Sequence, residues 1–152
     1  MENEKKIKVV LLEPGKLARA VEIDASLAGM QKVVGGLIEP FYPFEEQVCI
    51  VCNEESKING MRPNRSVKND DGVMVDFIFG PAFICDCRGE NLDSLSDEQI
   101  DRYGKMFRYP EHLARVNGTL FGIPYRPQPE QEAGLRLTAI GESSDRRPSR
   151  AP

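Results

Sequence analysis

The four cysteines have the spacing that most resembles a chemical site in this chain. Two residues separate Cys49 from Cys52, and Cys85 and Cys87 could complete a set of four thiolates for zinc or redox chemistry. The apolar residues around Cys49 predict a buried strand, where residues three apart point to opposite faces. A zinc knuckle needs a tight turn between its cysteines, and a redox pair needs a helix N-terminus. We therefore expect four reduced, structural cysteines and no bound metal or other cofactor.

Catalytic residues are not predicted. The only histidine, His112, follows a Tyr-Pro pair in a charged segment, where a surface or packing role is usual. The paired acids Glu54 and Glu55 are expected to be solvated. A cation site at Asp70, Asp71 and Asp76 is conceivable, but its spacing matches no calcium loop. The chain contains no nucleophile elbow and no phosphate-binding glycine loop, so an enzyme is the least supported class.

A polar rim is the best candidate for ligand binding. If the predicted strands at residues 48–52 and 73–79 are neighbours, the loop between them places amides and guanidinium groups on one edge. An arginine there suits a small anionic ligand, because its fork matches phosphate or carboxylate. Alternatively, the loop acids simply pair with the arginines while the asparagines close turns. The candidate site residues are Asn53, Glu54, Arg62, Asn64 and Arg65.

Composition limits the class of protein. With 152 residues, 40% of them hydrophobic, the chain is long enough for one domain with a core that needs no metal or disulfide. A formal net charge of −4 argues against direct nucleic-acid binding, which needs a basic surface. No apolar run approaches the roughly 18 residues that span a bilayer, and the N-terminal segment does not resemble a secretory signal. We expect a cytoplasmic protein with no membrane partner.

The first half of the chain predicts a hairpin, a helix and two strands. Residues 6–12 and 17–23 alternate around a Pro-Gly turn and predict an N-terminal β-hairpin. Asp24 or Ser26 caps a short helix whose apolar residues recur at helical spacing and which Gly35 ends. Residues 37–44, with two prolines, predict an edge strand, and residues 48–52 predict a central strand.

The second half predicts a broken strand, a helix and a last hairpin. Residues 73–84 predict an apolar strand region with a break at Gly80. Ser94 or Ser96 begins a helix, and Ser96 has the capping-box spacing to Gln99. Residues 116–120 predict a small hairpin. The fold class is therefore α+β: a small mixed or antiparallel sheet with an N-terminal β-hairpin and two short helices. We expect a single domain over residues 1–125 and a disordered tail over residues 126–152, which is polar and rich in proline.

Several short motifs resemble one family. The chain reads GG-x-I-E at residues 35–39, C-N-E-E-x-K-x-N-G at residues 52–60, and D-F-I-F-G at residues 76–80. Together with the opening hairpin and helix, this order resembles the domain of unknown function 3846, over about residues 5–124. The resemblance implies an uncharacterised accessory protein of bacterial phages, plasmids or conjugative elements, and it supplies no catalytic residues. Ser56 departs from the glycine that the family often has at this turn, and Pro81 departs from an expected strand residue.

These observations lead to one functional hypothesis and two alternatives. The leading hypothesis is a non-enzymatic accessory or interaction protein of a mobile element that binds a host protein or a small ligand. The first alternative is an anti-defence protein that sequesters nucleotides through Arg65, Asn64 and Arg62. The second is an antirestriction protein that mimics DNA, although a charge of −4 is small for that role. The oligomeric state is not determined by the sequence.

Overall fold

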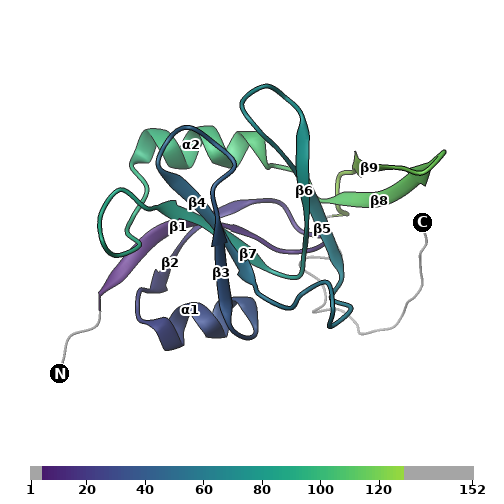
Figure 1. Ribbon diagram of the computed structural model, residues 1–152. Helices are drawn as coiled ribbons and strands as arrows, with labels where there is room; N and C mark the ends of the chain where they lie inside the picture. The colour runs from purple at the N-terminus through teal and green to yellow at the C-terminus, as the bar shows by residue number, and fades with distance from the viewer. Residues whose placement is uncertain (1–4, 129–152) are drawn as a thin grey trace.

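The computed structural model describes residues 5–128, which form an α+β fold around a five-stranded sheet (Figure 1). The sheet has the strand order β2-β1-β7-β4-β3, and the hairpins β5–β6 and β8–β9 form two separate two-stranded sheets. All neighbouring strands are antiparallel, which confirms the predicted fold class. The elements are β1 Lys6–Leu12, β2 Arg19–Asp24, α1 Leu27–Val34, β3 Ile38–Phe41, β4 Val48–Asn53, β5 Pro63–Lys68, β6 Met74–Phe79, β7 Ala82–Asp86, α2 Asp97–Met106, β8 Glu111–Val116 and β9 Thr119–Pro124.

The N-terminal hairpin and α1 follow from local sequence. β1 and β2 pair from Lys6 opposite Asp24 to Leu11 opposite Arg19. The hydroxyl of Ser26 accepts a hydrogen bond from the Gly29 amide at 3.0 Å and caps α1. Gly35 ends the helix in the left-handed conformation, with φ of 83°. The predicted hairpin, helix and stop are confirmed.

Alternation along the strands gives the sheet two buried faces. Figure 1 shows α1 and α2 on opposite sides of the sheet. The face beneath α1 carries Ile7, Val9, Leu11, Cys49, Val51, Phe83 and Cys85. The face beneath α2 and the β5–β6 hairpin carries Val10, Leu12, Val48, Ile50, Ala82 and Ile84. Because both faces are covered, the interior strands β4 and β7 are almost continuously apolar, and β7 rather than β4 holds the middle position.

The β5–β6 hairpin is the main departure from expectation. The sequence places residues 63–68 in a loop, but they form β5, and β6 pairs with β5 instead of lying beside β4. The polar residues of β5 carry little strand signal, so long-range contacts decide their conformation. The predicted break is confirmed: Gly80, with φ of 77°, lets the chain pass from β6 into β7 of the main sheet.

Helix α2 is fixed to the sheet by packing and by one carboxylate. Ser96 and Gln99 form the predicted capping box. The carboxylate of Glu46, in the segment before β4, accepts hydrogen bonds from Tyr103 at 2.5 Å, Arg102 at 2.8 Å and Gln99 at 2.8 Å. The Arg102 donors, followed by the Tyr103 hydroxyl, lower the pKa of Glu46 from 4.5 to about 2.

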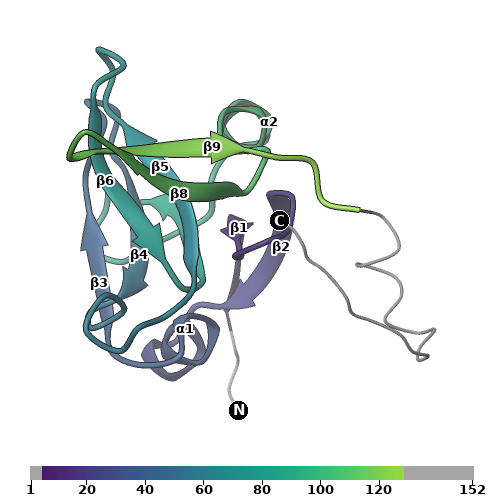
Figure 2. The ribbon, with the colours of Figure 1, turned by 90° about the vertical axis from the view of Figure 1, so that its right-hand side faces the viewer.

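The β8–β9 hairpin packs across the β5–β6 hairpin (Figure 2). Its turn is Asn117-Gly118, with φ of 51° and 83°, which confirms the hairpin predicted at residues 116–120. The carboxylate of Glu111 accepts a hydrogen bond from the Ser66 amide at 2.9 Å and joins β8 to β5.

The predicted tail falls almost wholly on residues 129–152, outside the described residues, so its disorder and the domain boundary at residue 125 stay predictions. Over residues 5–128, neither helix has the length and apolar character that crossing a membrane would require.

Candidate ligand pocket

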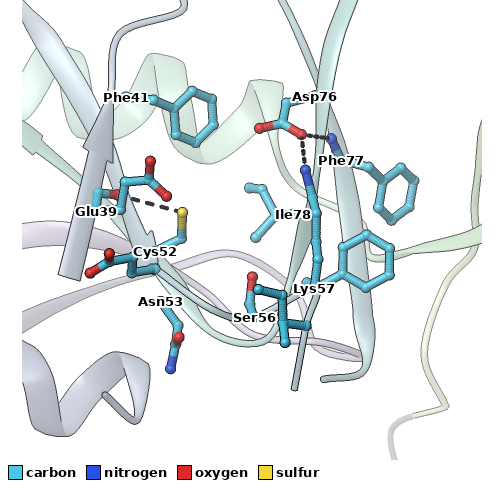
Figure 3. Close-up of a pocket in the computed structure, with 12 residues that line it drawn as sticks. Glu39, Phe41, Cys52, Asn53, Ser56, Lys57, Asp76, Phe77 and Ile78 are labelled. Carbon is cyan, nitrogen blue, oxygen red and sulfur yellow. Dashed lines mark hydrogen bonds and ion pairs between the residues drawn. The ribbon is translucent and has the colours of Figure 1, made fainter. Parts of the chain in front are cut away.

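A pocket of about 270 Å³ lies between β6 and the paired strands β3 and β4 (Figure 3). These strands belong to different sheets, so side chains rather than backbone hydrogen bonds occupy the space between them. The turn after β4 forms a third side. The lining residues are Glu39, Phe41, Cys52, Asn53, Glu54, Ser56, Lys57, Ile58, Asp76, Phe77, Ile78 and Phe79.

The register of β3 and β4 builds the first wall. Glu39 is opposite Cys52, and Phe41 is opposite Ile50, so these four side chains share the sheet face that the β5–β6 hairpin covers. The Cys52 thiol donates a hydrogen bond to the Glu39 carbonyl at 3.5 Å. Burial raises the pKa of Cys52 to about 11, with a smaller contribution from the Glu39 carboxylate, so the thiol is neutral at pH 7.

The opposite wall comes from β6. Figure 3 shows Asp76 and Ile78 directed toward the pocket, while the Phe77 ring points to the far side of the strand. The Lys57 ammonium reaches from the turn after β4 and donates to Asp76 Oδ1 at 2.7 Å. The same oxygen accepts the Phe77 amide at 2.8 Å. One oxygen of this carboxylate is therefore used twice.

Some polar groups that line the pocket have hydrogen-bonding positions that no described residue fills. Ser56 is only 6% exposed, and among residues 5–128 its hydroxyl has no hydrogen-bond partner. Three carboxylate side chains line the pocket, those of Glu39, Glu54 and Asp76, against the single ammonium of Lys57. A buried polar group without a partner costs free energy, which a ligand that supplies the missing hydrogen bond can recover.

Two of the five predicted site residues, Asn53 and Glu54, line this pocket. The Asn53 side chain turns away toward α1 (Figure 3), where its amide donates to the Val34 carbonyl at 3.2 Å and accepts from the Glu55 amide at 2.7 Å. It therefore holds the end of α1 against the turn after β4. Glu54 is exposed at the rim.

The other three predicted site residues do not line the pocket. Asn64 and Arg65 were expected on an exposed loop, and that placement is wrong: they are 0% and 1% exposed in β5. Arg62 is exposed, beside Gly15. Contacts between a ligand and these three residues stay a prediction, and such contacts would lie outside this pocket.

Protein oxygens accept hydrogen bonds from four of the five N–H donors of the Arg65 guanidinium. It donates to Asn64 Oδ1 at 2.8 Å, to the carbonyls of Glu13 and Lys16 at 3.0 and 2.6 Å, and to the Phe107 carbonyl. Asn64 in turn donates to the carbonyls of Leu12 and Gly80 at 3.0 and 2.8 Å. Burial lowers the pKa of Arg65 to about 10, which leaves it charged at pH 7. This pair therefore ties β5 to the β1–β2 turn and to the end of α2.

The cysteines divide between the two faces of the sheet, as the sequence predicts. Cys49 and Cys85 are opposite each other on β4 and β7 beneath α1, with 3.8 Å between their sulfur atoms. Cys52 lies on the opposite face. In the part of the chain that is described, all four thiols are free, and no three His, Cys, Asp or Glu side chains gather as a metal site would require. Asp70, a candidate cation ligand from the sequence, accepts a hydrogen bond from the Glu45 backbone amide at 2.9 Å.

The residue types of the pocket do not identify it in the sequence, although the segments that form it carry recognisable motifs. Glu39, Cys52, Lys57, Asp76 and Ile78 were not predicted as neighbours. However, they belong to the motifs at residues 35–39, 52–60 and 76–80, and these three motifs meet around the pocket. In the sequence, therefore, the three motifs together mark the pocket, and no single catalytic residue does.

Comparison with known proteins gives one match. A family model described as Domain of unknown function (DUF3846) matches residues 7–108, from β1 through α2, and so includes every residue that lines the pocket. The β8–β9 hairpin lies beyond the matched range. No curated protein and no solved structure matches the chain.

Proposed function

The chain belongs to the domain of unknown function 3846 family, and we propose that it is a binding protein without enzymatic activity whose pocket holds a small molecule. The observation that carries this proposal is the convergence of three separate motifs, at residues 35–39, 52–60 and 76–80, around that pocket. A well-formed concave site is the first candidate for ligand binding in a protein.

The shape and lining of the pocket support a small molecule. Its volume of about 270 Å³ is near the lower end of the size of ligand sites. Phe41 and Ile78 offer apolar contact, and Ser56 offers a buried hydroxyl that lacks a partner among the described residues. Apolar walls with a few convergent polar groups are the usual composition of such sites.

The state of the polar groups supports binding without catalysis. The Cys52 thiol has a pKa of about 11 and is a poor nucleophile at pH 7. Lys57 and Asp76 form an ion pair with each other at 2.7 Å. The His112 ring lies on β8, outside the pocket, and stacks on Tyr125 with 4.1 Å between the ring centroids. No base is therefore positioned next to a nucleophile in the pocket.

We also propose a cytoplasmic accessory role. The free thiols of the described residues support a reducing compartment. The assignment to a phage, plasmid or conjugative element has its support in the family resemblance alone. Nucleotide sequestration is placed second, because phosphates need exposed basic groups and the Lys57 ammonium is already paired with Asp76. Antirestriction gains no support from the pocket.

A fragment screen tests the proposed function. The full chain is labelled with ¹⁵N, and its amide spectrum is recorded against a library of small cationic, neutral and anionic compounds. We expect hits whose shifts cluster at Cys52, Lys57 and Ile78. The absence of any hit at these amides would refute the proposal.

Two matched variants localise the binding. Phe41→Leu removes a half-buried ring from the pocket wall, whereas Phe121→Leu removes an exposed ring from β9. We expect Phe41→Leu to weaken a hit about threefold or more, in line with the contribution of one aromatic contact, and Phe121→Leu to leave it unchanged. Equal effects of the two substitutions would place binding elsewhere.

A further inference from the structure

We infer that the ligand of this pocket is an organic ammonium ion on a small apolar body, an inference that rests on the proposed function. The charges come first. The carboxylates of Glu39, Glu54 and Asp76 line the pocket, and Lys57 is the counter-charge among the lining residues. With Lys57 held by Asp76 at 2.7 Å, the pocket keeps an excess of two negative charges for a ligand to meet.

The acceptors that face the pocket are available. Asp76 uses Oδ1 for both of its hydrogen bonds, and within residues 5–128 its other oxygen has no partner. The Glu39 carboxylate likewise makes no hydrogen bond or ion pair to any described residue. An ammonium group has only donors, so the two carboxylates and the Ser56 hydroxyl oxygen are the kind of partner that it needs.

The apolar part of the pocket defines the rest of the ligand. Phe41 from β3 and Ile78 from β6 face the same space from opposite walls (Figure 3). Burial of a small ring or alkyl group there removes apolar surface from water, and an aromatic wall also tolerates a nearby cation. An amine attached to a short apolar group satisfies both features.

Other ligand classes fit less well. An anion would approach three carboxylates, and the pairing of Lys57 with Asp76 would have to break to compensate it. The sequence predicts an anionic ligand through Arg62, Asn64 and Arg65, but Asn64 and Arg65 are buried and the exposed Arg62 does not line this pocket. A metal ion would need several close ligands, and within residues 5–128 no group of three candidate ligands is close enough.

A set of matched probes tests the inference on the full chain. The probes are 2-phenylethylammonium, the neutral 2-phenylethanol and the anionic 3-phenylpropanoate, which share a ring and differ in charge. A lysine blocked at both backbone ends serves as a fourth probe. It distinguishes a free amine from the lysine side chain of a partner protein. Dissociation constants come from amide shifts at Cys52, Lys57 and Ile78.

We expect the ammonium probe to bind about tenfold or more tightly than the carboxylate probe, with an affinity that falls as salt is added. Glu39→Gln should weaken ammonium binding about three- to fivefold, because Glu39 is exposed and its charge is partly screened. Glu22→Gln is the control: Glu22 is exposed on β2, at the opposite edge of the sheet. Glu22→Gln should leave the dissociation constant of the ammonium probe unchanged.

The outcomes separate the two proposals. Binding of the alcohol or the carboxylate at the same amides, as tightly as the ammonium, overturns the ligand class and leaves the proposed function standing. If neither these probes nor the fragment library shifts the pocket amides, the proposed function fails and the inference fails with it. Tighter binding of the blocked lysine than of 2-phenylethylammonium supports the ammonium class and assigns its source to a protein side chain.

Discussion

Replacement of Arg65 by methionine is expected to destabilise the fold strongly, because the Arg65 side chain donates hydrogen bonds to oxygen atoms inside the protein. Methionine keeps much of the apolar stem but removes every donor. The Phe107 carbonyl and Asn64 Oδ1 then lose their Arg65 donor inside the protein, while the Glu13 and Lys16 carbonyls belong to a turn that water can reach. Each buried oxygen that loses its donor costs about 1–3 kcal/mol.

The expected loss is therefore about 3 kcal/mol, after part of that cost is offset by no longer burying a guanidinium. Desolvation is the source of this offset, and it also lowers the pKa of Arg65 to about 10. A loss of this size is a large fraction of the roughly 5–15 kcal/mol that stabilises an ordinary domain. It should lower the urea midpoint by about 2 M if the denaturant slope is about 1.5 kcal/mol per M.

Urea unfolding followed by circular dichroism measures this change, since the chain has no tryptophan for fluorescence. Arg65→Lys retains one cation with fewer donors and should lose about half as much. It also keeps the test usable if the methionine variant does not fold. Arg62→Met, at the exposed arginine, should stay within about 0.5 kcal/mol of the native chain. A loss below about 1 kcal/mol for Arg65→Met would refute the structural role.

Three further results are expected. Glu46→Gln should cost about 1–2 kcal/mol at pH 7, discounted because the carboxylate is 35% exposed. Since folding lowers the pKa of Glu46 from 4.5 to about 2, this stability is complete above pH 4.5 and is lost as the pH falls through 2; a difference that does not shrink in acid contradicts the assignment. Cys52 and Cys87, each with a pKa raised to about 11, should react with iodoacetamide at pH 8 about a hundredfold more slowly than an ordinary thiol, and mass spectrometry that finds rapid labelling of either refutes this. Gly35→Ala should lower the free energy of unfolding by about 1 kcal/mol, because φ there is 83°, whereas Gly104→Ala within α2 should raise it by about 0.5–1 kcal/mol; thermal melts that rank the two variants in the opposite order contradict both.

The elements that sequence reasoning located are those whose causes are local. The Ser26 cap and the Gly35 stop depend on hydrogen bonds and dihedral angles within a few residues, and the Ser96 capping box closes over three residues. The Asn117-Gly118 turn needs only two residues that accept positive φ. Opposite orientations of Cys49 and Cys52 follow from the period of a strand.

The burial of Arg65 does not follow from its local sequence. An arginine in a polar stretch of sequence is usually exposed, yet this one is buried by acceptors that lie 42, 49 and 52 residues away. No pattern within β5 reveals those partners. The same is true of its pairing with β6, which removes β6 from the neighbourhood that the sequence assigned to it.

By itself, then, the sequence determined the local elements, their caps, the two-faced apolar pattern and the family to which the chain belongs. Only the tertiary structure decided which polar residues are interior and which surround a pocket. The physical reason is that hydrogen bonds within a few residues are dictated by residue type and spacing. The burial of Arg65 and the meeting of Glu39 with Asp76 instead depend on how two separate sheets pack.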